Sequence, residues 1–168
     1  KMSLAQTLKK MGQLHRAKRI FHTLSLNPEN ERRQLNTWQE LVDINRHEGK
    51  RPAVVKYLKK IDSLVEGDSV AAVLGEYYFN TGDFTAAADA FEDAARRSTD
   101  EDKKARCLKE SIVSLFRASS ITRAGAAENE FRKSFDEEDF FEDYQAQFYL
   151  ERGRYLVGEK KFQEAVEL

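Results

Sequence analysis

The sequence predicts an all-α fold, an αα superhelix (solenoid) built from about five helix-turn-helix hairpins. Three observations predict it. The chain has only 2 Pro in 168 residues, well below the usual ~5%, so little interrupts its helices. Apolar and small residues recur every three or four positions, which is helical spacing. Similar segments also repeat along the chain, and a repeat of about 34 to 40 residues is typical of stacked helical hairpins.

The clearest hairpin spans residues 68–98. Its first half carries the pattern Ala-x2-Leu-Gly-x2-Tyr, its second half carries Ala-x3-Phe-x2-Ala, and Asn-Thr-Gly-Asp lies between them as a turn. Glycine supplies the left-handed conformation of such a turn, and the Asp caps the helix that follows. The pattern residues are Ala71, Leu74, Gly75, Tyr78, Ala87, Phe91 and Ala94.

The second-helix pattern recurs along the rest of the chain. Its anchor pairs are Ala17 with Phe21, Val54 with Leu58, Ala127 with Phe131, and Phe162 with Ala165. The fourth unit, read this way, has a longer connection between its helices than the others. We therefore expect a single repeat domain over 1–168, in units at 1–28, 31–63, 68–98, 102–136 and 143–168.

These residues resemble the tetratricopeptide repeat, whose pattern is W-x2-L-G-x2-Y followed by A-x3-F. The match is fullest in the third unit, and the fifth keeps Gly153 but has Arg152 and Leu156 in place of Leu and Tyr. In this pattern Gly75 and Ala87 lie where the two helices approach closest. The resemblance implies a non-catalytic scaffold that binds a partner peptide or helix in a concave groove lined by the first helix of each unit.

The resemblance also places the groove residues on the first helices. In the second unit they are Gln39, Asp43, Arg46 and His47, and in the third Ala72, Glu76, Phe79 and Asn80. In the fourth they are Arg106, Glu110, Val113 and Ser114, and in the fifth Leu150, Arg154 and Val157.

One known use of such a groove is not expected here. Co-chaperones of this family hold acidic chaperone tails with Lys and Asn at groove positions, which in this chain are Gln39 and Asp43, or Ala72 and Glu76. An acidic residue in place of the Asn repels a terminal carboxylate. We therefore expect no carboxylate clamp.

The charges are divided along the chain. Residues 1–60 hold 14 Lys and Arg against 5 Asp and Glu, a net charge of +9, and residues 61–168 hold 14 against 24, a net charge of −10. Such asymmetry points to charged partners. A protein or peptide partner is the preferred reading. The alternatives are RNA or other nucleic acid bound by the basic N-terminal hairpins, and salt-sensitive self-association through the oppositely charged ends.

Residues that carry catalysis are sparse. His15 and His22 are seven apart on one helix, but no third ligand stands at a metal-site spacing, so we expect two exposed histidines. His47 suits a helix end, where a cation is favoured, and Cys107 reads as a small buried hydrophobe. No phosphate-binding glycine motif occurs. We expect no enzyme, no metal and no cofactor.

The segment from Phe135 to Tyr144 alternates aromatic and acidic residues. It reads first as an acidic turn and helix start whose aromatics pack inward, because Phe141, Tyr144, Phe148 and Tyr155 recur at helical spacing. The alternative is an exposed docking element.

Composition excludes several other classes of protein. With 40% hydrophobic and 11% aromatic residues, the chain is too apolar for disorder, and 1 Cys and 8 Gly exclude a disulfide-stapled or collagen-like chain. No apolar run approaches the roughly 20 residues that cross a bilayer. Because both ends lie within a helical pattern, we expect a piece of a longer protein. The compartment stays open between cytoplasm, our first choice, bacterial periplasm, and attachment to a larger envelope protein.

Overall fold

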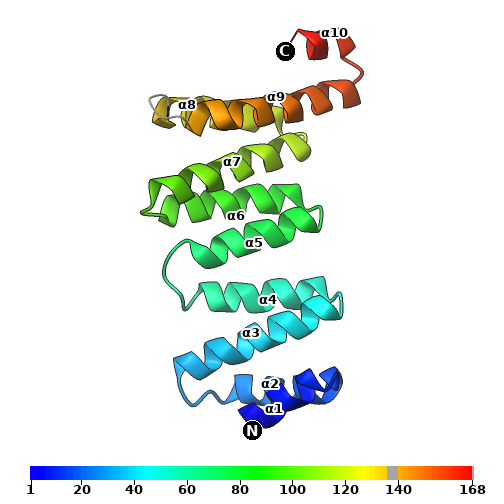
Figure 1. The fold of residues 1–168 in the computed structure, drawn as a ribbon, viewed down its shortest axis with the longest axis vertical. Helices are drawn as coiled ribbons and strands as arrows, with labels where there is room; N and C mark the ends of the chain where they lie inside the picture. Colours follow the sequence, from blue (N-terminus) through cyan, green and yellow to red (C-terminus); the bar gives the residue numbers. More distant parts are fainter. Residues whose placement is uncertain (136–139, 168) are drawn as a thin grey trace. The chain divides into compact units, whose positions relative to one another are not determined.

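The computed structural model describes residues 1–135 and 140–167. Regular structure in these residues is helical throughout, arranged as five consecutive hairpins (Figure 1), which confirms the all-α repeat fold. None of the described helices is both long and apolar enough to cross a bilayer. Their bounds are α1 Met2–Lys10, α2 Leu14–Leu26, α3 Glu31–His47, α4 Arg51–Asp62, α5 Ser69–Asn80, α6 Phe84–Arg97, α7 Glu101–Arg117, α8 Ile121–Phe135, α9 Phe140–Gly158 and α10 Phe162–Val166.

Each hairpin closes through a three-residue turn with one shared geometry. The N–H of the last turn residue donates to a carbonyl near the end of the first helix, at 2.8–3.0 Å. The middle turn residue has a positive φ, between 58° and 82°, a conformation that costs Gly least. These middle residues are Gly12, Gly49, Gly82, Ser119 and Lys160. The accepting residues Leu8, Asn45, Tyr78, Leu115 and Leu156 are therefore equivalent, and they align the five hairpins residue by residue.

This alignment corrects the sequence reading of the fourth hairpin. The turn before α8 is as short as the others, and the extra length lies in α7, which has 17 residues where α5 has 12. The residue equivalent to Ala87 is therefore Ala124, not Ala127, and Glu128 takes the place of Phe91. The sequence pattern indicated Ala127 and Phe131 as the anchor pair because Phe131, one helical turn after Glu128, is also buried, at 1% exposure.

The chain forms two compact units, Lys1–Glu66 and Gly67–Leu168, here called unit 1 and unit 2. In unit 1 the fully buried side chains include Phe21, Leu41 and Val54. In unit 2 one buried cluster joins α6, α7, α8 and α9 around Ile112, Leu115 and Phe131. Each unit therefore has a core of its own.

Two buried carboxylates connect α9 to the hairpin before it. Glu128 on α8 accepts from the Arg152 guanidinium at 2.5 Å, and its side chain is 7% exposed. Glu151 on α9, at 4% exposure, pairs with Arg117 of α7 at 2.9 Å and with Arg154 at 2.7 Å. A buried charge of this kind is tolerated only when it is paired.

Aromatic packing joins the same helices. The Phe131 ring lies 5.8 Å from the Phe148 ring and 5.9 Å from the Tyr144 ring, both at edge-on angles. Phe135 is buried as well, so these aromatics pack inward as the helical spacing predicts. The acidic residues 136–139 between them lie outside the described residues, as does the Phe141 side chain.

Candidate binding groove

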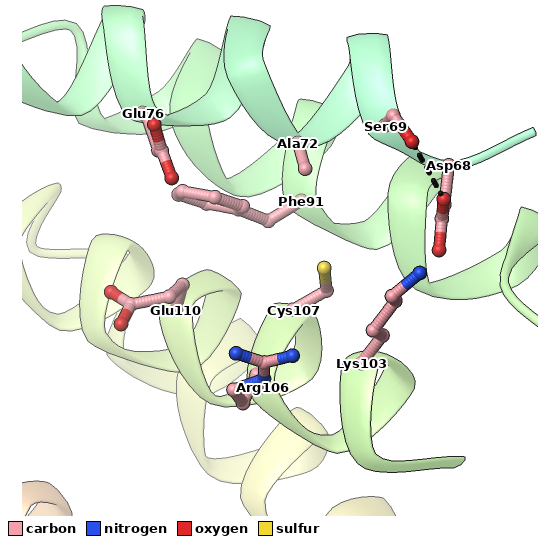
Figure 2. Close-up of a pocket in the computed structure, with 9 residues that line it drawn as sticks. All are labelled: Asp68, Ser69, Ala72, Glu76, Phe91, Lys103, Arg106, Cys107 and Glu110. Atoms are coloured by element: carbon pink, nitrogen blue, oxygen red, sulfur yellow. Dashed lines mark hydrogen bonds between the residues drawn. The ribbon is translucent and has the colours of Figure 1, made fainter. Parts of the chain in front are cut away.

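A hollow of 390 Å³ lies between the first helices of the third and fourth hairpins, α5 and α7, within unit 2. Figure 2 shows side chains from both helices pointing into it, with Phe91 from α6 between them. The lining side chains are mixed in charge and include one thiol. They are Asp68, Ser69, Ala72, Glu76, Phe91, Lys103, Arg106, Cys107 and Glu110.

Phe91 is held in place by a glycine. A Cβ added to Gly75 would come within 2.7 Å of the Phe91 ring, a distance that nonbonded carbons do not tolerate. Gly75 therefore lets the ring pack flat against α5, as the spacing of the two residues in the sequence predicts. The ring is 4% exposed and forms the apolar wall of the hollow.

Carboxylates outnumber cations in the lining of the hollow, with Asp68, Glu76 and Glu110 against Lys103 and Arg106. Burial raises the pKa of the Cys107 thiol, and the negative charges of Asp68, Glu110 and Glu76 raise it further, while Arg106 opposes them. A thiolate is thus disfavoured there, and the thiol is no activated nucleophile. The same field favours a cation in the hollow.

At the other end of the hollow, Asp68 is fixed by a hydroxyl. Ser98 Oγ donates to the Asp68 carboxylate at 2.7 Å, which lowers the pKa of that carboxyl, and the charge of Lys103 adds to the effect. Asp68 precedes α5 and Ser98 follows α6, so this hydrogen bond ties the two ends of the third hairpin together.

The structure brings together part of the predicted groove. Ala72 and Glu76 of the third unit and Arg106 and Glu110 of the fourth all line the hollow. Asn80 is exposed at the end of α5, away from the lining set.

Two other residues that were predicted to line the groove are buried inside the protein. Val113 is 1% exposed and Ser114 is fully buried, so the expectation that they face a partner is wrong. Val113 belongs to the buried cluster of unit 2, and the Ser114 hydroxyl donates to the Glu110 carbonyl at 2.7 Å. Phe79 packs edge-on against Phe84, with ring centroids 5.4 Å apart, and lies under the Arg117 guanidinium.

In unit 1 the predicted residues lie on α3. Gln39, Asp43, Arg46 and His47 are all exposed, and Asp43 accepts from Lys9 of α1 at 2.9 Å. In the fifth hairpin Arg154 is exposed but paired with Glu151, and its neighbours Leu150 and Val157 are 52% and 51% exposed.

Five of the lining residues were not predicted as groove residues, namely Asp68, Ser69, Phe91, Lys103 and Cys107. Asp68 and Lys103 stand at the starts of α5 and α7, and Cys107 was taken only as a small hydrophobe. Lys103 lies in the first turn of α7, in the part by which this helix of 17 residues exceeds the 12 residues of α5.

Basic residues of unit 1 are partly neutralised within the fold. The Glu48 carboxylate accepts from Lys18 at 2.5 Å and from Lys50 at 2.9 Å, and these hydrogen bonds lower its pKa. Lys60 lies over the Trp38 ring, 5.3 Å from its centroid. These three cations are engaged by the protein itself.

The third hairpin matches a known family. Residues 69–101 match the model of the tetratricopeptide repeat, a helical-hairpin architecture of protein-interaction scaffolds. Residues 69–101 are thus a tetratricopeptide repeat, and this repeat is the hairpin that forms one wall of the hollow. No curated protein matches the chain.

Proposed function

We propose that this chain is a non-catalytic scaffold that binds a peptide or helix of a partner protein in the hollow between α5 and α7. The observation that carries the proposal is the hollow itself, which two successive first helices of a tetratricopeptide array line with charged and apolar side chains. Because packed hairpins hold these side chains in place, a partner binds a preorganised surface and less conformational entropy is lost.

A blocking substitution tests this location. Selection of random peptides, about a dozen residues long, on the full chain provides binders. Ala72 lines the hollow, so Ala72→Trp fills it and should abolish their binding. Ala126→Trp adds the same side chain to an exposed position of α8 and should leave binding unchanged. Selection of no peptide, or equal binding to both variants, contradicts the proposal.

Self-association is a second candidate, favoured by the charges of the two units. Unit 1 holds 14 Lys and Arg against 7 Asp and Glu, a net charge of +7, and unit 2 holds 14 against 22, a net charge of −8. Unit 1 of one molecule then attracts unit 2 of another. Sedimentation velocity should show association at low ionic strength that disappears near 1 M salt, where the screening length is about 3 Å. A salt-independent monomer rules this candidate out.

A further inference from the structure

The hollow between α5 and α7 has a counterpart in unit 1, between α1 and α3. The shared turn geometry makes Gln6 equivalent to Glu76, Lys9 to Phe79 and Glu40 to Glu110. A cavity of 370 Å³ lies there too, lined by Gln6, Lys9, Lys10 and Glu40. The same place in the repeat can therefore be compared within one chain.

In unit 1 the protein supplies its own cation. Lys9 Nζ donates to Glu40 at 2.7 Å and to Asp43 at 2.9 Å, and Gln6 donates to the other Glu40 oxygen at 3.0 Å. Burial works against the charge on Lys9, but the two carboxylates outweigh it and raise the pKa of the ammonium. The carboxylate of α3 is thus satisfied by two donors from α1.

In unit 2 both donors are missing. The position of Gln6 is occupied by Glu76, which has no N–H to donate. The position of Lys9 is occupied by Phe79, which packs on Phe84. Glu110 retains one cation, Lys109 at 2.5 Å on its own helix. Across residues 1–135 and 140–167, no cation pairs with the Glu76 carboxylate. Figure 2 shows that carboxylate directed toward the edge of the Phe91 ring, inside the hollow.

We propose that the hollow accepts a lysine or arginine side chain of the partner peptide, whose charged end pairs with Glu76 and Glu110 and whose stem passes the exposed edge of the Phe91 ring. The proposal rests on the proposed function and specifies its ligand. The partner's cation takes the part that Lys9 plays in unit 1. Carboxylates attract the charged end, and an aromatic ring suits both an aliphatic stem and a cation. The excess of negative charge in unit 2 also favours a basic partner.

The selected peptides test this inference. A lysine or arginine should be enriched at one position, and its replacement by Gln should weaken binding about tenfold. Glu76→Gln should weaken the basic peptides about fivefold. Glu76→Lys should abolish their binding and restore binding of peptides that carry Glu at the enriched position. Glu159→Lys changes the net charge equally in an exposed turn outside the hollow and should change affinity less than about twofold.

The outcomes separate this inference from the proposed function. Peptides that Ala72→Trp blocks but that show no basic preference, or that bind Glu76→Lys and Glu159→Lys equally, overturn the cation site and leave the groove intact. Failure to select any peptide overturns both. Circular dichroism of each variant checks that its helical content is unchanged.

Discussion

The third and fourth hairpins share one backbone plan but fill it with different chemistry. In the third, Phe91 packs against Gly75. At the equivalent places in the fourth, Glu128 and Ile112 are as deeply buried, at 5% and 1% exposure. The glutamate is satisfied by Arg152, which stands in the next hairpin where the third has Leu74. The repeat therefore requires a side chain that fills the buried position and, if that side chain is polar, a partner for its charge. It does not require one residue type.

The largest effect should come from breaking the buried pair. Arg152→Ala leaves the Glu128 carboxylate buried and without its partner, and should lower the free energy of unfolding by about 3 kcal/mol. Glu128→Ala should cost less, since Arg152 is 32% exposed and can reach water. Urea denaturation of the full chain, followed by circular dichroism, measures both.

A double substitution sharpens that result. Glu128→Leu with Arg152→Leu replaces the pair by apolar side chains and should recover stability to within about 1 kcal/mol of the original chain. If the double variant is as unstable as Arg152→Ala, the position requires the charge pair, and the comparison between the hairpins fails.

The glycine of the third hairpin should give the next largest effect. Gly75→Ala forces a methyl group into the Phe91 ring and should destabilise the chain by about 2 kcal/mol, because overpacking outweighs the better helix propensity of alanine. Gly153, the equivalent residue in α9, has no atom within 4 Å of an added Cβ. Gly153→Ala should therefore stabilise by up to about 1 kcal/mol, and thermal unfolding of the two variants should shift in opposite directions.

A smaller effect is expected from the turns of the two hairpins. Gly82 and Ser119 occupy the same left-handed position, with φ of 82° and 58°. Ser119→Gly should stabilise the chain by about 0.5 kcal/mol and Gly82→Ser should destabilise it by about 1 kcal/mol. Equal and unchanged melting temperatures would mean that this φ carries no strain.

The smallest effect concerns pH and the third hairpin alone. The hydrogen bond from Ser98 lowers the pKa of Asp68, so it stabilises the fold above the unfolded carboxyl pKa of about 3.9 and is lost as pH falls through the lower folded value. Ser98→Ala should therefore be slightly less stable than the original chain near neutral pH, and the difference should close in acid. A difference that stays the same from neutral pH into acid contradicts this assignment.

The sequence predicted the helical repeat because its period and small-residue pattern depend on the backbone plan that all five hairpins share. It failed in the fourth hairpin, where a buried glutamate stands at the aromatic position. Only its partner Arg152, 24 residues away, explains how that glutamate is tolerated. Val113, predicted in the groove, packs in the buried cluster of unit 2 instead. Glu76, Arg106 and Glu110, which the sequence placed in a groove, line the hollow, but the charges around them come from residues far apart in the sequence.

The central claim is that the first helices of the third and fourth hairpins bind a partner between them. Chemical-shift mapping of the isotope-labelled chain, titrated with a selected basic peptide, tests it most directly. The account predicts that the largest amide shifts fall in residues 69–76 of α5 and residues 103–110 of α7. Shifts concentrated on the second helices α6 and α8, or in unit 1, would contradict it.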